Sequence, residues 1–93
     1  MEIVGKIIAE LGLREGVSQV TGNPWKIASY VIETIEAFPK RMVFDVSDGT
    51  AGRIERLGIK KDQVMHVWFE IDAHEKDGKW FNAIRAYDAR VAG

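Results

Sequence analysis

Residues 64–91, VMHVWFEIDAHEKDGKWFNAIRAYDARV, decide the fold because they hold two β-type runs joined by Asp77-Gly78. An Asp-Gly pair between such runs is the strongest short-range signal for a β-hairpin, since a two-residue type I′ turn requires a positive φ at both central positions. Residues at equal distance from the turn then pair across the two strands. This register sets Glu70 opposite Arg85, a favourable cross-strand pair worth about 0.2–1 kcal/mol.

Alternate residues of a strand point to opposite faces, so the hairpin has two predicted faces. The face expected to line the core carries Val67, Phe69, Ile71 and Ala73 on the first strand and Trp80, Asn82, Ile84 and Ala86 on the second. The face expected to lie outside carries Trp68, Glu70, Asp72, His74, Phe81, Ala83, Arg85 and Tyr87. The same register sets Trp68 opposite Tyr87. Three aromatic rings on one outer face indicate an interface.

Three further strands are predicted upstream of the hairpin. They span residues 2–13, 25–35 and 41–47, separated by a loop at 14–24 and a turn at 36–40. The first run also contains helix formers, but its alternation of β-branched residues and the absence of a preceding cap favour a strand. Gly5 inside this run predicts a bend or bulge. In the third strand Met42, Phe44 and Val46 are expected to face inward, whereas the inward face of the second strand is left open.

One short helix is predicted between the third strand and the hairpin. Thr50 is a plausible N-cap residue, and Ile54 and Leu57 lie on one helical face. Gly58 follows at the position that favours a left-handed residue, and Ile59 supplies the apolar contact after it. Such a helix is marginal alone, and we expect it to plug the open end of a barrel.

Composition narrows the class of protein. The chain has 93 residues, enough for one small domain at 1–93, and 46% of them are hydrophobic, which favours a packed core over disorder. A formal net charge of −1 does not by itself indicate a nucleic-acid or membrane partner. The absence of cysteine excludes disulfides and thiolate metal sites. No signal peptide or transmembrane run is evident, so a cytoplasmic location is expected.

The order of three strands, a short helix and two strands is typical of the OB-fold, a mainly β, five-stranded Greek-key barrel. The closing half resembles bacterial single-stranded-DNA-binding proteins in layout. The whole chain resembles a family of short bacterial OB-fold proteins known as a domain of unknown function. That resemblance is carried by MEIVGKI at 1–7, Trp25-Lys26, FPKRMVFDV at 38–46 and DGKWFNAIRAY at 77–87. One departure is Asp62-Gln63, where such proteins often have Gly-Asp.

The resemblance implies binding of single-stranded nucleic acid, DNA in the first instance, with little sequence preference. Such binding uses Lys and Arg along the phosphates and aromatic rings on which bases stack, at roughly 1–3 kcal/mol per base. The candidate residues are Trp25, Lys26, Lys40, Arg41, Trp68, Lys79, Phe81, Arg85 and Tyr87. Because one small barrel offers a short site, a homo-oligomer is expected.

Each candidate also has a structural interpretation. Trp25 could instead close the mouth of the barrel, the three lysines could be ordinary solvated charges at strand ends, and Arg85 could pair with Glu70. The outer rings at Trp68, Phe81 and Tyr87 could instead hold a second copy of the chain. The rival hypothesis is therefore a protein-interaction module that self-associates through this aromatic face.

Catalysis finds little support in the sequence. His66 and His74 are eight residues apart with no evident third ligand, so they do not predict a metal site. No nucleophile, base and orienting group can be proposed from spacing. The glycines of SDGTAG at 47–52 lack the Lys-Ser/Thr ending of a phosphate-binding P-loop. A non-enzyme without a metal or small-molecule cofactor is expected.

Overall fold

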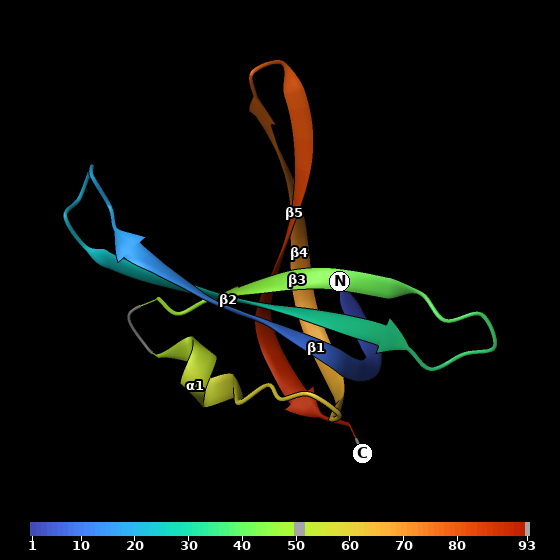
Figure 1. Ribbon diagram of the computed structural model, residues 1–93. Helices are drawn as coiled ribbons and strands as arrows, with labels where there is room; N and C mark the ends of the chain where they lie inside the picture. Colours follow the sequence, from blue (N-terminus) through green and yellow to red (C-terminus); the bar gives the residue numbers. More distant parts are fainter. Residues whose placement is uncertain (50–51, 93) are drawn as a thin grey trace.

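The computed structural model describes residues 1–49 and 52–92. Its elements are β1 (Glu2–Val17), β2 (Pro24–Thr34), β3 (Arg41–Ser47), α1 (Arg53–Leu57), β4 (Val64–Lys76) and β5 (Lys79–Val91). The strands close into a barrel in the order β1-β2-β3-β5-β4, with α1 between β3 and β4 (Figure 1). This is the OB-fold architecture that the order of predicted elements indicated.

The core lies inside the ring of strands and follows the alternation of β2 and β3. On β3 Phe44 and Val46 are buried and Met42 packs beside them, which confirms the inward face predicted for that strand. The sequence does not decide which face of β2 points into the barrel. In the structure the inward face is the one that carries its small and aromatic residues. The inward residues of β2 are Ala28, Tyr30 and Ile32. The rings of Tyr30 and Phe44 stack with centroids 5.5 Å apart, so neighbouring strands share one aromatic layer.

Gly5 marks the point where β1 closes the barrel. It pairs with Thr34 of β2 on one side and with Met65 of β4 on the other. A Cβ at Gly5 would collide with the carbonyl oxygen of Glu33, so glycine is needed for close approach of two strands. Of the bend or bulge predicted at Gly5, the bulge is wrong, because no register shift falls at Gly5. The register shifts of β1 lie further along, between Ile7 and Ala9 and between Glu10 and Gly12.

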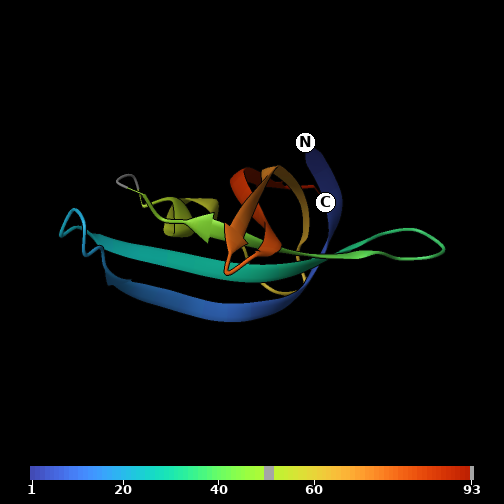
Figure 2. The same cartoon turned by 90° about the horizontal axis from the view of Figure 1, so that it is seen from above.

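The first arm of the molecule is the pair β1–β2, which continues past the barrel (Figures 1 and 2). The loop predicted at 14–24 is too long, because residues 14–17 belong to β1 and pair with 24–27 of β2. Glu15 and the turn former Gly16 lie in a strand here because each has a suitable partner on β2. Glu15 lies opposite Lys26, and Gly16 gives room to Trp25. The connecting loop is therefore only residues 18–23.

The hairpin turn forms as predicted. Asp77 and Gly78 have φ of 53° and 79°, the two positive values that a type I′ turn requires. The predicted register holds from Lys76 opposite Lys79 back to Phe69 opposite Ala86. A register shift then intervenes, so that the predicted pair of Trp68 with Tyr87 is wrong and Trp68 lies opposite Asp88.

The distal half of the β4–β5 hairpin is the second arm, and it stands away from the barrel (Figure 1). The prediction that one of its faces lines the core holds as far as Ile84, which packs against the core, and is wrong for Ile71 and for the residues nearer the tip. Ile71 is 47% exposed and Trp80 is 68% exposed. Alternation gives the face of each residue correctly, but a two-stranded ribbon with no third layer leaves both faces in solvent.

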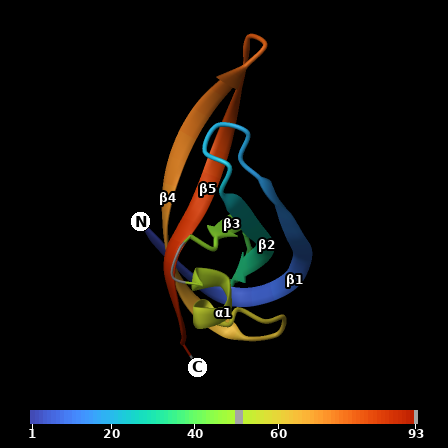
Figure 3. The ribbon, with the colours of Figure 1, turned by 90° about the vertical axis from the view of Figure 1, so that its left-hand side faces the viewer.

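Helix α1 lies against one end of the barrel and contacts β3 and β5 (Figure 3). The predicted apolar face is confirmed, because Ile54 and Leu57 pack against the core. The predicted N-cap, Thr50, lies outside the described residues. Asp48 satisfies the start of the helix: its Oδ1 accepts the N–H of Ile54 at 3.0 Å, and its carbonyl accepts the N–H of Arg53 at 3.0 Å.

Left-handed residues lie on either side of the turn that leads from α1 into β4. Gly58 has φ of 57° and donates its N–H to the carbonyl of Ile54, as predicted for the residue after the helix. Asp62 has φ of 74°, a conformation that favours glycine. This chain has Asp62-Gln63 where similar proteins often have Gly-Asp. The backbone at Asp62 nevertheless keeps the positive φ that glycine favours. Asp62 donates its N–H to the carbonyl of Ile7 at 2.7 Å, which ties the turn to β1.

Candidate nucleic-acid interface

A groove lies at the base of the β1–β2 arm, where β2 begins and β3 ends. It has a volume of about 560 Å³. Its lining residues are Asn23, Pro24, Trp25, Lys26, Ser47, Asp48 and Gly49. A concave site of this size with an aromatic side chain and several polar groups is typical of a small-ligand subsite.

The indole of Trp25 is held against Gly16 of the neighbouring strand. A Cβ at Gly16 would lie 2.7 Å from Cζ2 and 2.9 Å from Cε2 of the ring, which is closer than real Cβ atoms come. Gly16 therefore supports one part of the indole, while 41% of Trp25 stays exposed beside the groove. The structure does not use Trp25 to seal the core, whose buried cluster contains no tryptophan. A ring fixed on one side and exposed on the other is what base stacking requires.

The polar groups of the groove differ in how firmly they are held. Asp48 donates its main-chain N–H to the carbonyl of Lys26 at 3.0 Å and accepts two N–H groups from the start of α1. Its carboxylate is therefore held at the start of α1, while its backbone lies beside Lys26. The ammonium group of Lys26 is exposed and, within residues 1–49 and 52–92, forms no ion pair with a carboxylate.

A polar track continues from the groove across the outer face of the sheet. Ser29 lies opposite Asp45, and its hydroxyl donates to Asp45 Oδ1 at 2.6 Å. Arg14 approaches the other oxygen of Asp45 at 3.7 Å. Asp45 in turn lies opposite Arg85, the single pairing that joins β3 to β5. The outer face therefore links the Trp25 groove to the root of the second arm.

Lys40 and Arg41 do not join this track. They lie at the β2–β3 turn, at the far end of both strands from the groove (Figure 1). Lys40 is 3.7 Å from Glu36, and the Nε of Arg41 donates to Glu33 at 2.8 Å. Both cations therefore already have carboxylate partners, which a phosphate would have to displace.

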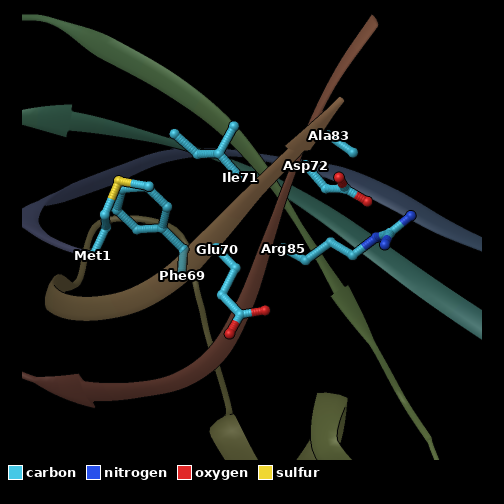
Figure 4. Close-up of a pocket in the computed structure, with 7 residues that line it drawn as sticks. All are labelled: Met1, Phe69, Glu70, Ile71, Asp72, Ala83 and Arg85. Carbon is cyan, nitrogen blue, oxygen red and sulfur yellow. The ribbon is translucent and has the colours of Figure 1, made fainter. Parts of the chain in front are cut away.

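A second groove, of about 460 Å³, lies at the root of the β4–β5 arm. Its lining residues are Met1, Phe69, Glu70, Ile71, Asp72, Ala83 and Arg85 (Figure 4). Arg85 and Glu70 are opposite each other in the register, but their side chains diverge in Figure 4 and form no ion pair within 4.0 Å. The predicted Glu70–Arg85 partnership is thus a backbone pairing. The guanidinium of Arg85 extends toward Asp72 and solvent.

The three outer rings of the hairpin are not gathered into one patch. Trp68 stacks on His66, with centroids 3.9 Å apart and planes 15° apart, and Arg90 lies 5.7 Å from its ring. Phe81 lies far along the arm and stacks on His74 with centroids 5.8 Å apart. Tyr87 is 45% exposed at the register shift between them. Trp68 and Phe81 are therefore each already stacked on a histidine ring, and Trp68 also has the Arg90 guanidinium near it.

The second arm is less suited to phosphate than the first. Lys79 is exposed beside the tip, but the carboxylates of the arm outnumber its cations. The charged residues of the arm are Glu70, Asp72, Glu75, Lys76, Asp77, Lys79 and Arg85. The cations that could contact a phosphate on this arm are Lys76 and Lys79 beside the tip and Arg85 at its root.

Other kinds of site find no support in the described part of the chain. Among residues 1–49 and 52–92, no three His, Asp or Glu side chains come together in a way that could hold a metal ion. In the same residues, no helix is long and apolar enough to cross a membrane.

Sequence reasoning missed several residues that shape the groove. The predicted loop at 14–24 contains Gly16 and Asn23, and Asp48 lies in the SDGTAG run at 47–52, for which no role is predicted. Their roles depend on which strand lies beside them, which the local pattern does not carry. The GNPWK run at 22–26, with an exposed aromatic between a turn and a lysine, is the signal that could have drawn attention to this region.

The fold and this surface define a five-stranded OB-fold barrel with a candidate binding groove at the first arm. The chain belongs to the family described as Domain of unknown function (DUF3127), whose model matches residues 2–90. The search of curated proteins gives no match.

Two solved structures share the fold at low sequence identity. The mitochondrial single-stranded DNA binding protein Rim1 of S. cerevisiae is 17% identical with a TM-score of 0.70, and the match covers 99% of this chain and 92% of that one. The N-terminal domain of PriB from Thermoanaerobacter tencongensis, described as dimeric, is 14% identical with a TM-score of 0.67. That match covers 100% of this chain and 94% of that one.

Proposed function

We propose that this protein is a non-catalytic OB-fold module that binds single-stranded DNA with little sequence preference. The observation that carries the proposal is the Trp25 groove, which is lined by a partly exposed indole and by Lys26, a lysine without a carboxylate partner among residues 1–49 and 52–92. The fold shared with Rim1, a mitochondrial single-stranded DNA binding protein, supports it. One barrel of this kind covers on the order of 4–16 nucleotides.

The strand would follow the outer face from the first arm to the second. It begins at Trp25 and Lys26, crosses β2 and β3 near Asp45, and reaches Arg85 at the root of the hairpin. Lys79 and Phe81 on the arm extend this path. Arg14 is 64% exposed and bound to only one carboxylate, so it can turn to a phosphate without leaving a buried charge.

The proposal is tested by titrating the protein with oligo-dT and following tryptophan fluorescence at low and high salt. Stacking on Trp25 predicts quenching at low salt, and phosphate contacts predict an affinity that falls with salt at a log–log slope of about −0.7 per contact. Trp25→Ala should lose most of the quenching. Absence of quenching at low salt, or an affinity indifferent to salt, would contradict the proposal.

A second candidate function is self-association through the aromatic outer face, favoured by the exposed ring of Tyr87 and by the partly exposed ring of Trp68. We propose that the module is a homo-oligomer in either case. Sedimentation of wild type, Trp68→Ala and Tyr87→Ala separates the functions. If both variants become monomers while wild type never binds DNA, the protein is an interaction module. If the variants keep DNA binding, these rings are not part of the DNA site.

A further inference from the structure

We infer that Arg14 is a phosphate-binding residue of the outer face and that Asp45 competes with the phosphate for its guanidinium group. The inference rests on the proposed binding of single-stranded DNA and deepens it, because it names the cation that holds the strand beside Trp25 and the carboxylate that limits the affinity. Asp45 is a positioning residue, which keeps Arg14 on the outer face until a strand binds.

Arg14 and Trp25 lie on the same face of the β1–β2 ladder. Arg14 is opposite Ile27 in the register, and Trp25 is two residues before Ile27, so both side chains point to one side. Ala28, next to Ile27, is buried, so this side is the outer face of the barrel. Diagonal neighbours of this kind are about 7–8 Å apart, within reach of long and aromatic side chains. A strand that stacks on Trp25 and follows the outer face therefore passes Arg14.

The guanidinium group of Arg14 already has an anionic partner. Its Nη2 is 3.7 Å from Oδ2 of Asp45 on β3, and the two side chains are 64% and 32% exposed. A partly exposed ion pair of this kind contributes little free energy, so a second anion can replace the carboxylate. A phosphate can accept two parallel N–H groups from one guanidinium, which favours this exchange.

The carboxylate of Asp45 is held in place by a contact that does not involve Arg14. Its Oδ1 accepts the hydroxyl of Ser29 at 2.6 Å, across the β2–β3 ladder. Asp45 is also the residue of β3 that pairs with Arg85 of β5, so a strand that runs from Trp25 to Arg85 passes over it. When Arg14 turns to a phosphate, the negative charge of Asp45 stays beside the bound strand and opposes it.

The first test replaces Asp45 with asparagine, which keeps an acceptor oxygen for Ser29 and removes the charge. Fluorescence anisotropy of labelled oligo-dT at fixed low salt and pH 7.5 gives the affinity. Asp45→Asn should bind oligo-dT about two- to fivefold more tightly than wild type. Glu33→Gln is the matched control, because Glu33 accepts the Nε of Arg41 at 2.8 Å at the far end of the same sheet. This control should leave the affinity unchanged.

The second test removes the cation. Arg14 is exposed, so the barrel of Arg14→Gln should fold, and urea unfolding of every variant checks this. Arg14→Gln should weaken binding and reduce the log–log salt slope by about 0.7, the value of one phosphate contact to a single strand. In a double-mutant cycle, Asp45→Asn should raise the affinity less in the Arg14→Gln background, because no guanidinium is left to release.

Each result has a distinct meaning. If wild type does not bind oligo-dT at low salt, the proposed function fails together with this inference. If wild type binds but Arg14→Gln keeps its affinity and salt slope, the inference is overturned while single-stranded DNA binding stands. Equal gains from Asp45→Asn with and without Arg14, or an equal gain from Glu33→Gln, would mean that only negative charge was removed, which overturns the competition.

Discussion

Trp25 and Gly16 lie opposite each other at the end of the β1–β2 ladder next to the connecting loop, and the absence of a side chain at Gly16 is what allows the indole to lie there. The contact connects a feature of the fold to the proposed site. A strand that could have ended at Leu13 continues to Val17, and its last glycine supports the exposed ring.

Gly16→Ala should weaken binding of single-stranded DNA. The added Cβ would come within 2.7 Å of the indole and displace it, so a large part of the stacking contribution of about 1–3 kcal/mol is lost. The measurement is the affinity for oligo-dT in a double-mutant cycle with Trp25→Ala. In the Trp25→Ala background the glycine substitution should have no further effect, and an equal loss in both backgrounds would show that Gly16 acts by another route.

Asp62→Gly should be more stable than Asp62→Ala. A φ of 74° costs a non-glycine residue roughly 1–2 kcal/mol, and glycine removes most of that cost. Both variants lose the 3.9 Å ion pair with Lys6, so their difference isolates the backbone contribution. Urea unfolding should give a difference of about 1 kcal/mol in favour of glycine. Equal midpoints would show that the Asp62 backbone is relaxed.

Trp80→Ala should leave the free energy of unfolding within about 0.5 kcal/mol of wild type, because Trp80 stands in solvent on the second arm. Phe44→Ala, the matched aromatic deletion in the core, should cost roughly 3–5 kcal/mol. Chemical denaturation of both variants checks the contrast. A loss at Trp80 comparable to that at Phe44 would mean that the arm folds back onto a hydrophobic partner.

Because Tyr30 is buried, the free energy of unfolding should fall in strong alkali. Burial, and secondarily the carboxylate of Glu10 opposite it, raise the pKa of Tyr30 above its ordinary value near 10. The folded state therefore holds this proton more tightly than the unfolded chain. The resulting stability is complete below a pH of about 10 and is lost as pH rises through the folded pKa. Tyr30→Phe should flatten this decline in urea unfolding above pH 10, and parallel curves would contradict the assignment.

Local pattern was sufficient for the parts of the fold that local chemistry determines. Asp77-Gly78 set the turn and most of the hairpin register, and the alternation of residues 41–47 set the inward face of β3. The Gly58 helix end followed from the same kind of local rule.

The errors arose where a distant partner decides the outcome. Trp80 has the alternation of a core residue, but no layer of the barrel reaches that far along the hairpin. Residues 14–17 contain the turn former Gly16, yet β2 pairs with all four of them. The register shift that separates Trp68 from Tyr87 has no marker in the sequence. The Trp25 groove depends on Gly16 and Asp48, which are brought beside Trp25 only by strand pairing.

The most direct test of single-stranded DNA binding at the first arm uses the three tryptophans, whose indole N–H groups give separate signals in ¹H–¹⁵N NMR spectra. Single Trp→Phe variants assign the signals, and oligo-dT is then titrated at low salt. The account predicts a large shift of the Trp25 signal and little change at Trp68, which His66 and Arg90 cover. A Trp25 signal that stays in place while the DNA binds, or no change at any of the three indoles, would contradict it.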